Sequence, residues 1–188
     1  MVTREQAWAL LTAWTPSERL RIHALGVEKV MEDLAVRHGQ DPAVYALAGL
    51  LHDADYDQWP EEHPARIVAW LQEQGEEVVA RAVAAHATER TGVKPESLLE
   101  CALVASDEVT GFVTACALVR PQRTEGLEPK SLRKKMKTPG FAAGVDRAIV
   151  TEGFRLLSER VGGTEDEHFQ RVVAVLHQHR ELLGLLPV

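Results

Sequence analysis

The sequence predicts an all-α fold, and three observations support this prediction. Apolar residues recur with the three-to-four-residue spacing of helices through nearly all of the 188-residue chain. Prolines and small polar residues stand where helices would begin, and glycines stand where they would end. No segment shows the one-in-two alternation of apolar and polar residues that indicates a β-strand. A chain of this length supports one hydrophobic core, so we expect a single-domain helical bundle over residues 1–188.

The expected helices follow one another with short connections. Residues 3–14 form an opening helix, and residues 15–39 form a long one with Thr15 as its cap and Pro16 in its first turn. Residues 41–53 are apolar nearly all round, which is typical of a buried helix. Six further helices are expected over residues 63–75, 76–90, 95–119, 131–137, 143–163 and 164–186.

The composition is that of an ordinary globular protein, with 45% hydrophobic and 26% charged residues. Its apolar stretches are short and punctuated, so we expect no membrane-spanning helix and no membrane partner. The polar N-terminus does not resemble a signal peptide. The two cysteines, Cys101 and Cys116, lie in an apolar helical pattern and are expected to be reduced core residues. Together these features predict a cytoplasmic protein.

Charge is unevenly distributed along the chain. The net charge is −7, which argues against non-specific binding of nucleic acid, so we expect no nucleic-acid partner. Residues 120–137 nevertheless carry seven basic and two acidic side chains, a net charge of +5 in one short segment. This segment is a candidate for attracting an anion, although a solvated charged helix face would have the same composition.

The eight histidines fall into two groups. Four of them stand near expected helix ends or on mixed faces and are expected at the surface: His38, His168, His177 and His179. The other four lie inside apolar helices or at the start of a helix: His23, His52, His63 and His86. Asp53 follows His52 directly, and Asp107 lies inside a long apolar helix, where an unpaired carboxylate would be costly. A cation that neutralises the acids and accepts the imidazole nitrogens explains these residues together.

The ordered set His23, His52-Asp53 and Asp107 resembles the signature of the HD-domain metal-dependent phosphohydrolases, an all-α superfamily. The resemblance implies that these four residues hold a divalent metal ion at the centre of a helical bundle. It runs from about residue 16 to residue 111, which would form the metal-site core. A basic linker and helix over residues 120–140 and additional C-terminal helices over residues 141–188 would follow.

Two further matches imply a second metal ion. "HPARIVAWL" is similar to the helix start that follows the His-Asp pair in binuclear members, and His86 stands where those members have their next histidine. His63 and His86 would then complete six ligands, with Asp53 as the bridge. The alternatives are a capping role for His63 and a hydrogen-bonded pocket histidine at His86. The chain also departs from two subtypes, because Tyr56 replaces the glutamate of the nucleoside monophosphate phosphatases and no Gly-Tyr-Pro motif follows His86.

The resemblance implies hydrolysis of a phosphate ester by metal-activated water. Imidazole and carboxylate ligands without cysteine suit one or two ions of Mn, Fe, Co, Ni, Zn or Mg, and such an ion lowers the pKa of bound water to roughly 7. Asp53, Asp55 and Glu62 are the candidate catalytic acids. The expected substrate is a small anionic phosphorylated molecule with a nucleotide-like character. Candidate phosphate-binding residues come from the basic segment: Arg133, Lys134 and Lys137, with Arg120 and Arg147 as further candidates.

Two other functions are compatible with the same residues. Some HD-fold proteins with the six-ligand set hold a di-iron centre and act as oxygenases, and the ligand types alone do not separate the two chemistries. A metal-binding regulatory module without turnover is the other alternative. No pattern in the sequence specifies an oligomeric state, and a homodimer is the base-rate expectation.

Overall fold

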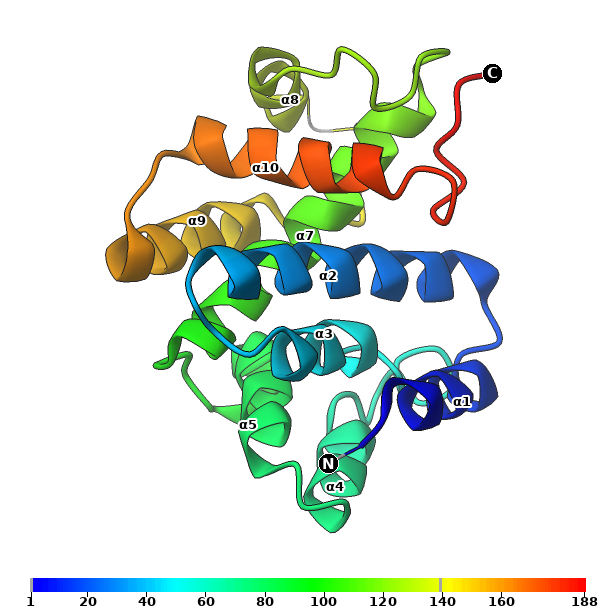
Figure 1. Ribbon diagram of the computed structural model, residues 1–188, viewed down its shortest axis with the longest axis vertical. Helices are drawn as coiled ribbons and strands as arrows, with labels where there is room; N and C mark the ends of the chain where they lie inside the picture. The colour runs from blue at the N-terminus through cyan, green and yellow to red at the C-terminus, as the bar shows by residue number, and fades with distance from the viewer. Residues whose placement is uncertain (1, 139) are drawn as a thin grey trace. The chain divides into compact units, whose positions relative to one another are not determined.

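The computed structural model describes residues 2–138 and 140–188, and within them it has ten helices and no strand. The predicted all-α fold is therefore confirmed (Figure 1). The chain divides into two compact units, Met1–Leu103 and Val104–Val188, which are described separately. The single domain expected over residues 1–188 stays a prediction.

The first unit contains six complete helices and the start of a seventh: α1 (Arg4–Trp14), α2 (Glu18–Arg37), α3 (Pro42–Leu51), α4 (Ala65–Glu73), α5 (Glu77–His86), α6 (Thr88–Thr91) and the first residues of α7 (Leu98–Leu118). Helix α3 packs against α2, and Figure 1 shows them side by side. Their backbones approach closely at Gly49, where an added Cβ would lie 2.9 Å from the carbonyl oxygen of Val27. Only glycine fits there, and this contact fixes the C-terminal end of α3.

The loop after α3 is tied to the start of α2. The hydroxyl of Thr15 donates to the carbonyl of Ala54 at 3.0 Å, and the Asp57 carboxylate accepts from the backbone N–H of Ser17 at 2.7 Å. The N-cap of α2 is Ser17, so the expectation that Thr15 caps this helix is wrong. Thr15 is instead the C-cap residue of α1 and is buried by its contact with the loop.

The second unit contains most of α7 together with α8 (Pro129–Met136), α9 (Arg147–Val161) and α10 (Glu165–Gln178). Helix α9 lies directly against α7 at Gly153, where an added Cβ would come within 2.8 Å of the Ala105 backbone. Two aromatic side chains pack edge to face beside this contact, with ring centroids of Phe154 and Phe169 4.9 Å apart. A buried aromatic core thus holds α7, α9 and α10 together.

Some helix boundaries differ from those predicted. Helix α5 ends at His86, and a separate short helix, α6, follows it, because Ala87 leaves the helical conformation. Helix α10 ends at Gln178 and does not continue to residue 186. Both differences lie at the C-terminal ends of helices, and after α10 the apolar spacing continues in the sequence although the helix itself has stopped.

Helix α7 corrects the expectation that no segment approaches a membrane span. It is 21 residues long, with a mean hydropathy of 1.4 in its most apolar window, so it is long and apolar enough to cross a membrane. The acids at positions 100, 107 and 108 made the apolar run look shorter than it is. About three fifths of that window, 61%, is buried inside the protein, which is also typical of a core helix. The cytoplasmic location stays a prediction.

His168 is buried, contrary to the expectation that it lies at the surface. It is 5% exposed, its Nε2–H donates to the carbonyl of Ala105 at 2.7 Å, and its ring packs on Phe154. The sequence suggested a solvated position because the residue lies in the first turn of α10, but this turn faces α7. Burial lowers the pKa of His168 to about 4, because the protonated ring would bring a second N–H into a site where Nδ1 has no partner.

We expect acid to weaken the fold through His168. Its pKa falls from an ordinary 6.5 to about 4 on folding, so the stabilisation is complete above pH 6.5 and is lost as the pH falls towards 4. The loss amounts to about 3 kcal/mol at 1.36 kcal/mol per pKa unit. Replacing His168 with glutamine should flatten the fall in urea midpoint between pH 7 and pH 4.5. His179→Gln, at the C-cap of the same helix, is the control and should keep the wild-type slope; equal slopes in all three proteins would contradict this role.

Candidate metal centre

The end of α3 sets the position of the first two candidate ligands. His52 is the C-cap residue of this helix and is fully buried, and Asp53 follows it in the loop. The close contact at Gly49 holds this end of α3 against α2, the helix that carries His23. The rings of His23 and His52 meet edge to face with centroids 5.4 Å apart. Packing of two helices therefore brings these side chains together.

Three of the histidines are held by their Nδ1 atoms. Nδ1–H of His52 donates to the carbonyl of Gly49 at 2.8 Å, and Nδ1–H of His86 donates to the carbonyl of Val83. Nδ1–H of His63 donates to a carboxylate oxygen of Asp55 at 2.7 Å. These bonds select the tautomer whose Nε2 lone pair is available, which is the usual arrangement of histidines that bind metal ions.

The Nε2 atoms of these three rings surround the Asp53 carboxylate. They lie 3.4 Å (His52), 3.4 Å (His63) and 3.5 Å (His86) from its oxygens. Burial raises the pKa of the Asp53 carboxyl, but the His52 and His86 rings together lower it by more than burial raises it. The pKa is therefore well below 3.8. Asp53 is therefore ionised at neutral pH and offers two anionic oxygens to the cluster.

The spacing of these atoms suits a divalent metal ion. Two ligand atoms bound to one ion at about 2.1 Å, with angles of about 90–109°, lie about 3.0–3.4 Å apart. The observed separations around Asp53, 3.4–3.5 Å, are close to this range. His23, His52 and Asp53 each offer a ligand atom within 4.8 Å of the others, and so do Asp53, His63 and His86. Clustered His and Asp side chains in the first unit thus fit metal binding, with Asp53 common to both groups.

Asp55 is placed behind the cluster. It is fully buried, and besides its bond from His63 it accepts from the backbone N–H groups of Arg66 and Ile67 at 3.1 and 3.0 Å. Those two groups belong to the first turn of α4, where an anion interacts favourably with the helix dipole. Asp55 therefore caps α4 and orients His63 at the same time, and all of these contacts point its oxygens away from solvent.

The first unit brings together five of the six predicted ligands, and the sixth lies in the second unit. Asp107 stands on α7 and is half-buried. Glu62, predicted as a catalytic acid, is half-exposed and pairs with Arg66 at 2.9 Å. Glu62 stands four residues before Arg66, and its carboxylate is bound to the Arg66 guanidinium.

The predicted phosphate-binding residues all lie in the second unit. Arg133 is engaged by both carboxylate oxygens of Asp166 at 2.6 Å. Arg147 donates to the backbone carbonyls of Ala142 and Val145 at 2.6 Å, so it braces a loop. The remaining candidates have three different surroundings: Lys137 is exposed, Lys134 lines a hollow, and Arg120 lines the same hollow and donates to the carbonyl of Glu125.

Arg90 and Tyr56 contact the cluster or its loop, and the sequence did not predict these contacts. Arg90, on α6, donates to the carbonyls of Pro60 and His63 at 2.7 and 3.3 Å and so braces the loop that carries His63. The Tyr56 ring stands edge-on to the His63 ring with centroids 5.4 Å apart, and it is 43% exposed. In the sequence, the contact made by Arg90 is indicated only by the position of this basic residue four places after His86. Such a residue is common on solvated helices.

The chain was compared with known protein families, curated proteins and solved structures. The HD domain family matches residues 20–111, a segment that includes all six predicted ligands. No curated protein matches the chain, and no solved structure matches it. The order of the ligand residues, the all-α fold and the family match agree. Residues 20–111 of the chain therefore form a domain of the HD family.

Proposed function

We propose that the protein is a metal-dependent phosphohydrolase acting on a small anionic phosphate ester. The observation that carries this proposal is the ring of three Nε2 atoms around the ionised Asp53 carboxylate, each imidazole being fixed through its Nδ1 atom. Membership of a superfamily in which metal-dependent hydrolysis of phosphate esters predominates supports the same chemistry. A bound divalent ion would activate water and neutralise the charge that develops on the phosphate.

The side chains of the first unit have distinct roles in this proposal. His23, His52 and Asp53 would hold one ion, with Asp107 as the predicted fourth ligand, and Asp53, His63 and His86 would hold a second. The Nδ1 bonds of His52, His63 and His86 keep these three rings in place before substrate arrives, so little reorganisation is needed during the reaction. The reaction adds water to phosphorus and breaks the bond between phosphorus and the ester oxygen, which leaves as an alcohol.

Asp55 is a positioning residue in this proposal. Its two oxygens accept three hydrogen bonds from His63, Arg66 and Ile67, so it acts on the reaction by fixing the His63 ring. Glu62 is more accessible than Asp55, and its carboxylate is paired with the Arg66 guanidinium. Tyr56 is exposed beside His63 and is suited to contact the substrate.

The proposal is tested by metal content and by activity. Protein purified without added metal or chelator should contain about two equivalents of a divalent metal, and His86→Ala should reduce this to about one. His177→Ala, which changes a histidine outside the cluster, is the control and should retain the wild-type content. The metal-loaded protein should release the alcohol from bis(p-nitrophenyl) phosphate or p-nitrophenyl phosphate, and chelation should stop this.

Three results would overturn the proposal. Protein that binds no metal and gains no activity with added Mn, Co or Fe would contradict the metal-dependent reaction. Bound iron with dioxygen uptake and no phosphate-ester cleavage would identify the oxygenase alternative. Metal binding with ligand-induced thermal stabilisation but no product from any phosphate ester would identify a regulatory module.

A further inference from the structure

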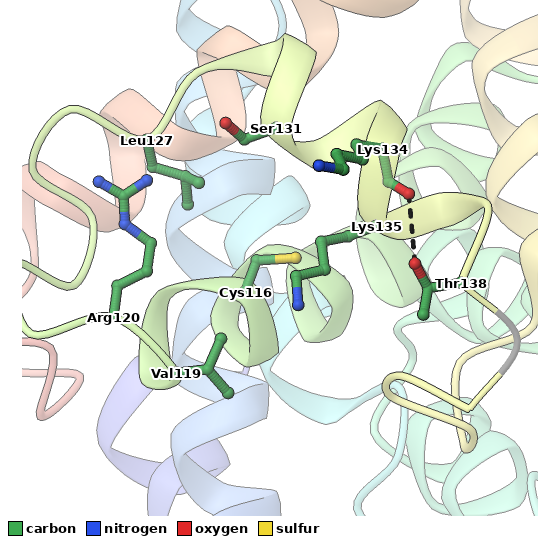
Figure 2. Close-up of a pocket in the computed structure, with 8 residues that line it drawn as sticks. All are labelled: Cys116, Val119, Arg120, Leu127, Ser131, Lys134, Lys135 and Thr138. Atoms are coloured by element: carbon green, nitrogen blue, oxygen red, sulfur yellow. Dashed lines mark hydrogen bonds between the residues drawn. The ribbon is translucent and has the colours of Figure 1, made fainter.

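We infer that the second unit contains a binding site for a small organic phosphate, formed by the end of α7, the segment that follows it, and α8. The site is a hollow of about 380 Å³, here called the α7–α8 pocket (Figure 2). Its lining comes from eight residues: Cys116, Val119, Arg120, Leu127, Ser131, Lys134, Lys135 and Thr138. A hollow of this size is at the lower end of the usual range for small-molecule sites.

Positive charge converges on the α7–α8 pocket from two sides. Figure 2 shows Arg120 on one side, and Lys134 and Lys135 from α8 on the other. None of its eight lining residues is acidic, although the chain as a whole carries a net charge of −7. Three cations without a lining carboxylate favour an anionic ligand, and a phosphate group can accept hydrogen bonds from all three.

The neighbouring Arg133 differs from the cations that line the pocket in having a carboxylate partner. Arg133 points to Asp166, whose carboxylate binds it through both oxygens. Lys135 lies over the Phe141 ring at 4.4 Å, which fixes its ammonium group without neutralising it. Arg120 uses one of its five N–H donors on the carbonyl of Glu125. The lining cations therefore keep donors for a ligand, whereas the charge of Arg133 is already balanced.

Cys116, in the lining of the pocket, lies within the electrostatic influence of three nearby cations. Burial raises the pKa of the Cys116 thiol to about 11, while Lys135, Arg147 and Arg120 each act to lower it. Three cations thus influence one buried atom in the pocket lining from different elements. A bound anion would meet the same field.

The remaining lining residues indicate that the ligand has an organic part. Val119 and Leu127 give the pocket apolar walls, and Val119 is 61% exposed. The hydroxyls of Ser131 and Thr138 provide polar positions on the α8 side. Inorganic phosphate would leave the apolar walls in contact with water, whereas a phosphate ester or phosphonate with an apolar body would cover them.

The pocket is distinct from the position of Asp107, the ligand predicted on the same helix. Cys116 lies nine residues beyond Asp107 on α7, which is about 13.5 Å along the axis and half a turn away in direction at 1.5 Å and 100° per residue. The two side chains therefore leave opposite sides of α7. This inference does not rest on the proposed function, because the pocket has its own charges and its own lining.

The experiment measures binding of phenylphosphonate, a stable compound with an anionic head and an apolar body, by calorimetry. Binding should persist after the metal is removed by chelation, and it should be tighter than that of inorganic phosphate. The double variant K134Q/K135Q should bind about tenfold more weakly or worse, since two charge-assisted contacts are lost. K130Q/K137Q removes the same charge from two residues that do not line the pocket, and its affinity should stay within about twofold of wild type.

Three outcomes would overturn the inference. Equal losses in both double variants would show general attraction to a basic segment. Loss of binding on chelation would place the ligand at a metal ion. An absence of binding up to the millimolar range would exclude the site, because a specific small organic anion should bind more tightly. The single variant K134Q changes an exposed side chain and should weaken binding several-fold, which guards against a folding defect in K134Q/K135Q.

Discussion

Replacing Asp53 with asparagine is expected to abolish both metal binding and phosphate-ester hydrolysis. The change keeps the shape of the side chain but removes the negative charge that three imidazole Nε2 atoms surround. Residues behind a metal ligand are alone worth about 10–100-fold in affinity or activity, so loss of a shared ligand should exceed about 100-fold. Metal content by plasma mass spectrometry and the rate of p-nitrophenol release from metal-loaded protein are the two measurements.

A matched control separates this effect from a general change of charge. Glu61 lies in the same loop and is exposed, so Glu61→Gln makes the same isosteric change outside the cluster. It should keep the metal content and the rate within about twofold, as a surface substitution should. An Asp53→Asn protein that retains two equivalents of metal would contradict the placement of Asp53 between two ions. One that loses metal but keeps its full rate would contradict a metal-dependent reaction.

The candidate metal ligands could be predicted from their residue types and from their order in the sequence. A carboxylate or histidine within an apolar helix is costly unless it is compensated, and this singles out His52 and Asp107 whatever the details of the fold. The start of α3 was predictable because Asp41 before Pro42 is a strong helix-start signal, and the structure confirms it. The ends of helices were less predictable, since α5 stops at His86 without a glycine or proline.

Contacts across an irregular loop could not be predicted. Asp55 meets His63 and the start of α4 eight to twelve residues later, and that depends on the path of the loop. The burial of His168 depends in the same way on which face of α10 meets α7, because local sequence is polar there. Arg133 lies 33 residues from Asp166 in sequence, so no local pattern distinguishes it from the lysines beside it.

Replacing Asp55 with alanine is expected to weaken metal binding and also to destabilise the fold. The buried carboxylate accepts three hydrogen bonds, so its removal leaves the donors of His63, Arg66 and Ile67 without an acceptor in the interior. Each such loss costs about 1–3 kcal/mol, and we expect a total of about 3 kcal/mol or more from urea unfolding of the metal-free protein. Release of the His63 ring should weaken metal binding about 10–100-fold.

Two further variants, Asp55→Asn and Asp57→Ala, separate the loss of stability from the loss of metal affinity. Asparagine retains one acceptor for α4 but a weaker one for His63, so Asp55→Asn should recover part of the stability while the metal affinity stays low. Asp57 caps α2 through Ser17 and lies two residues along the same loop, so Asp57→Ala should lose about 1 kcal/mol with little change in metal affinity. If Asp55→Ala lost stability alone and kept its metal affinity, Asp55 would serve only to cap α4. If Asp55→Ala lost neither stability nor metal affinity, the orientation of His63 would not depend on the Asp55 carboxylate. The second metal ion would then be held in place by His86 and Asp53 alone.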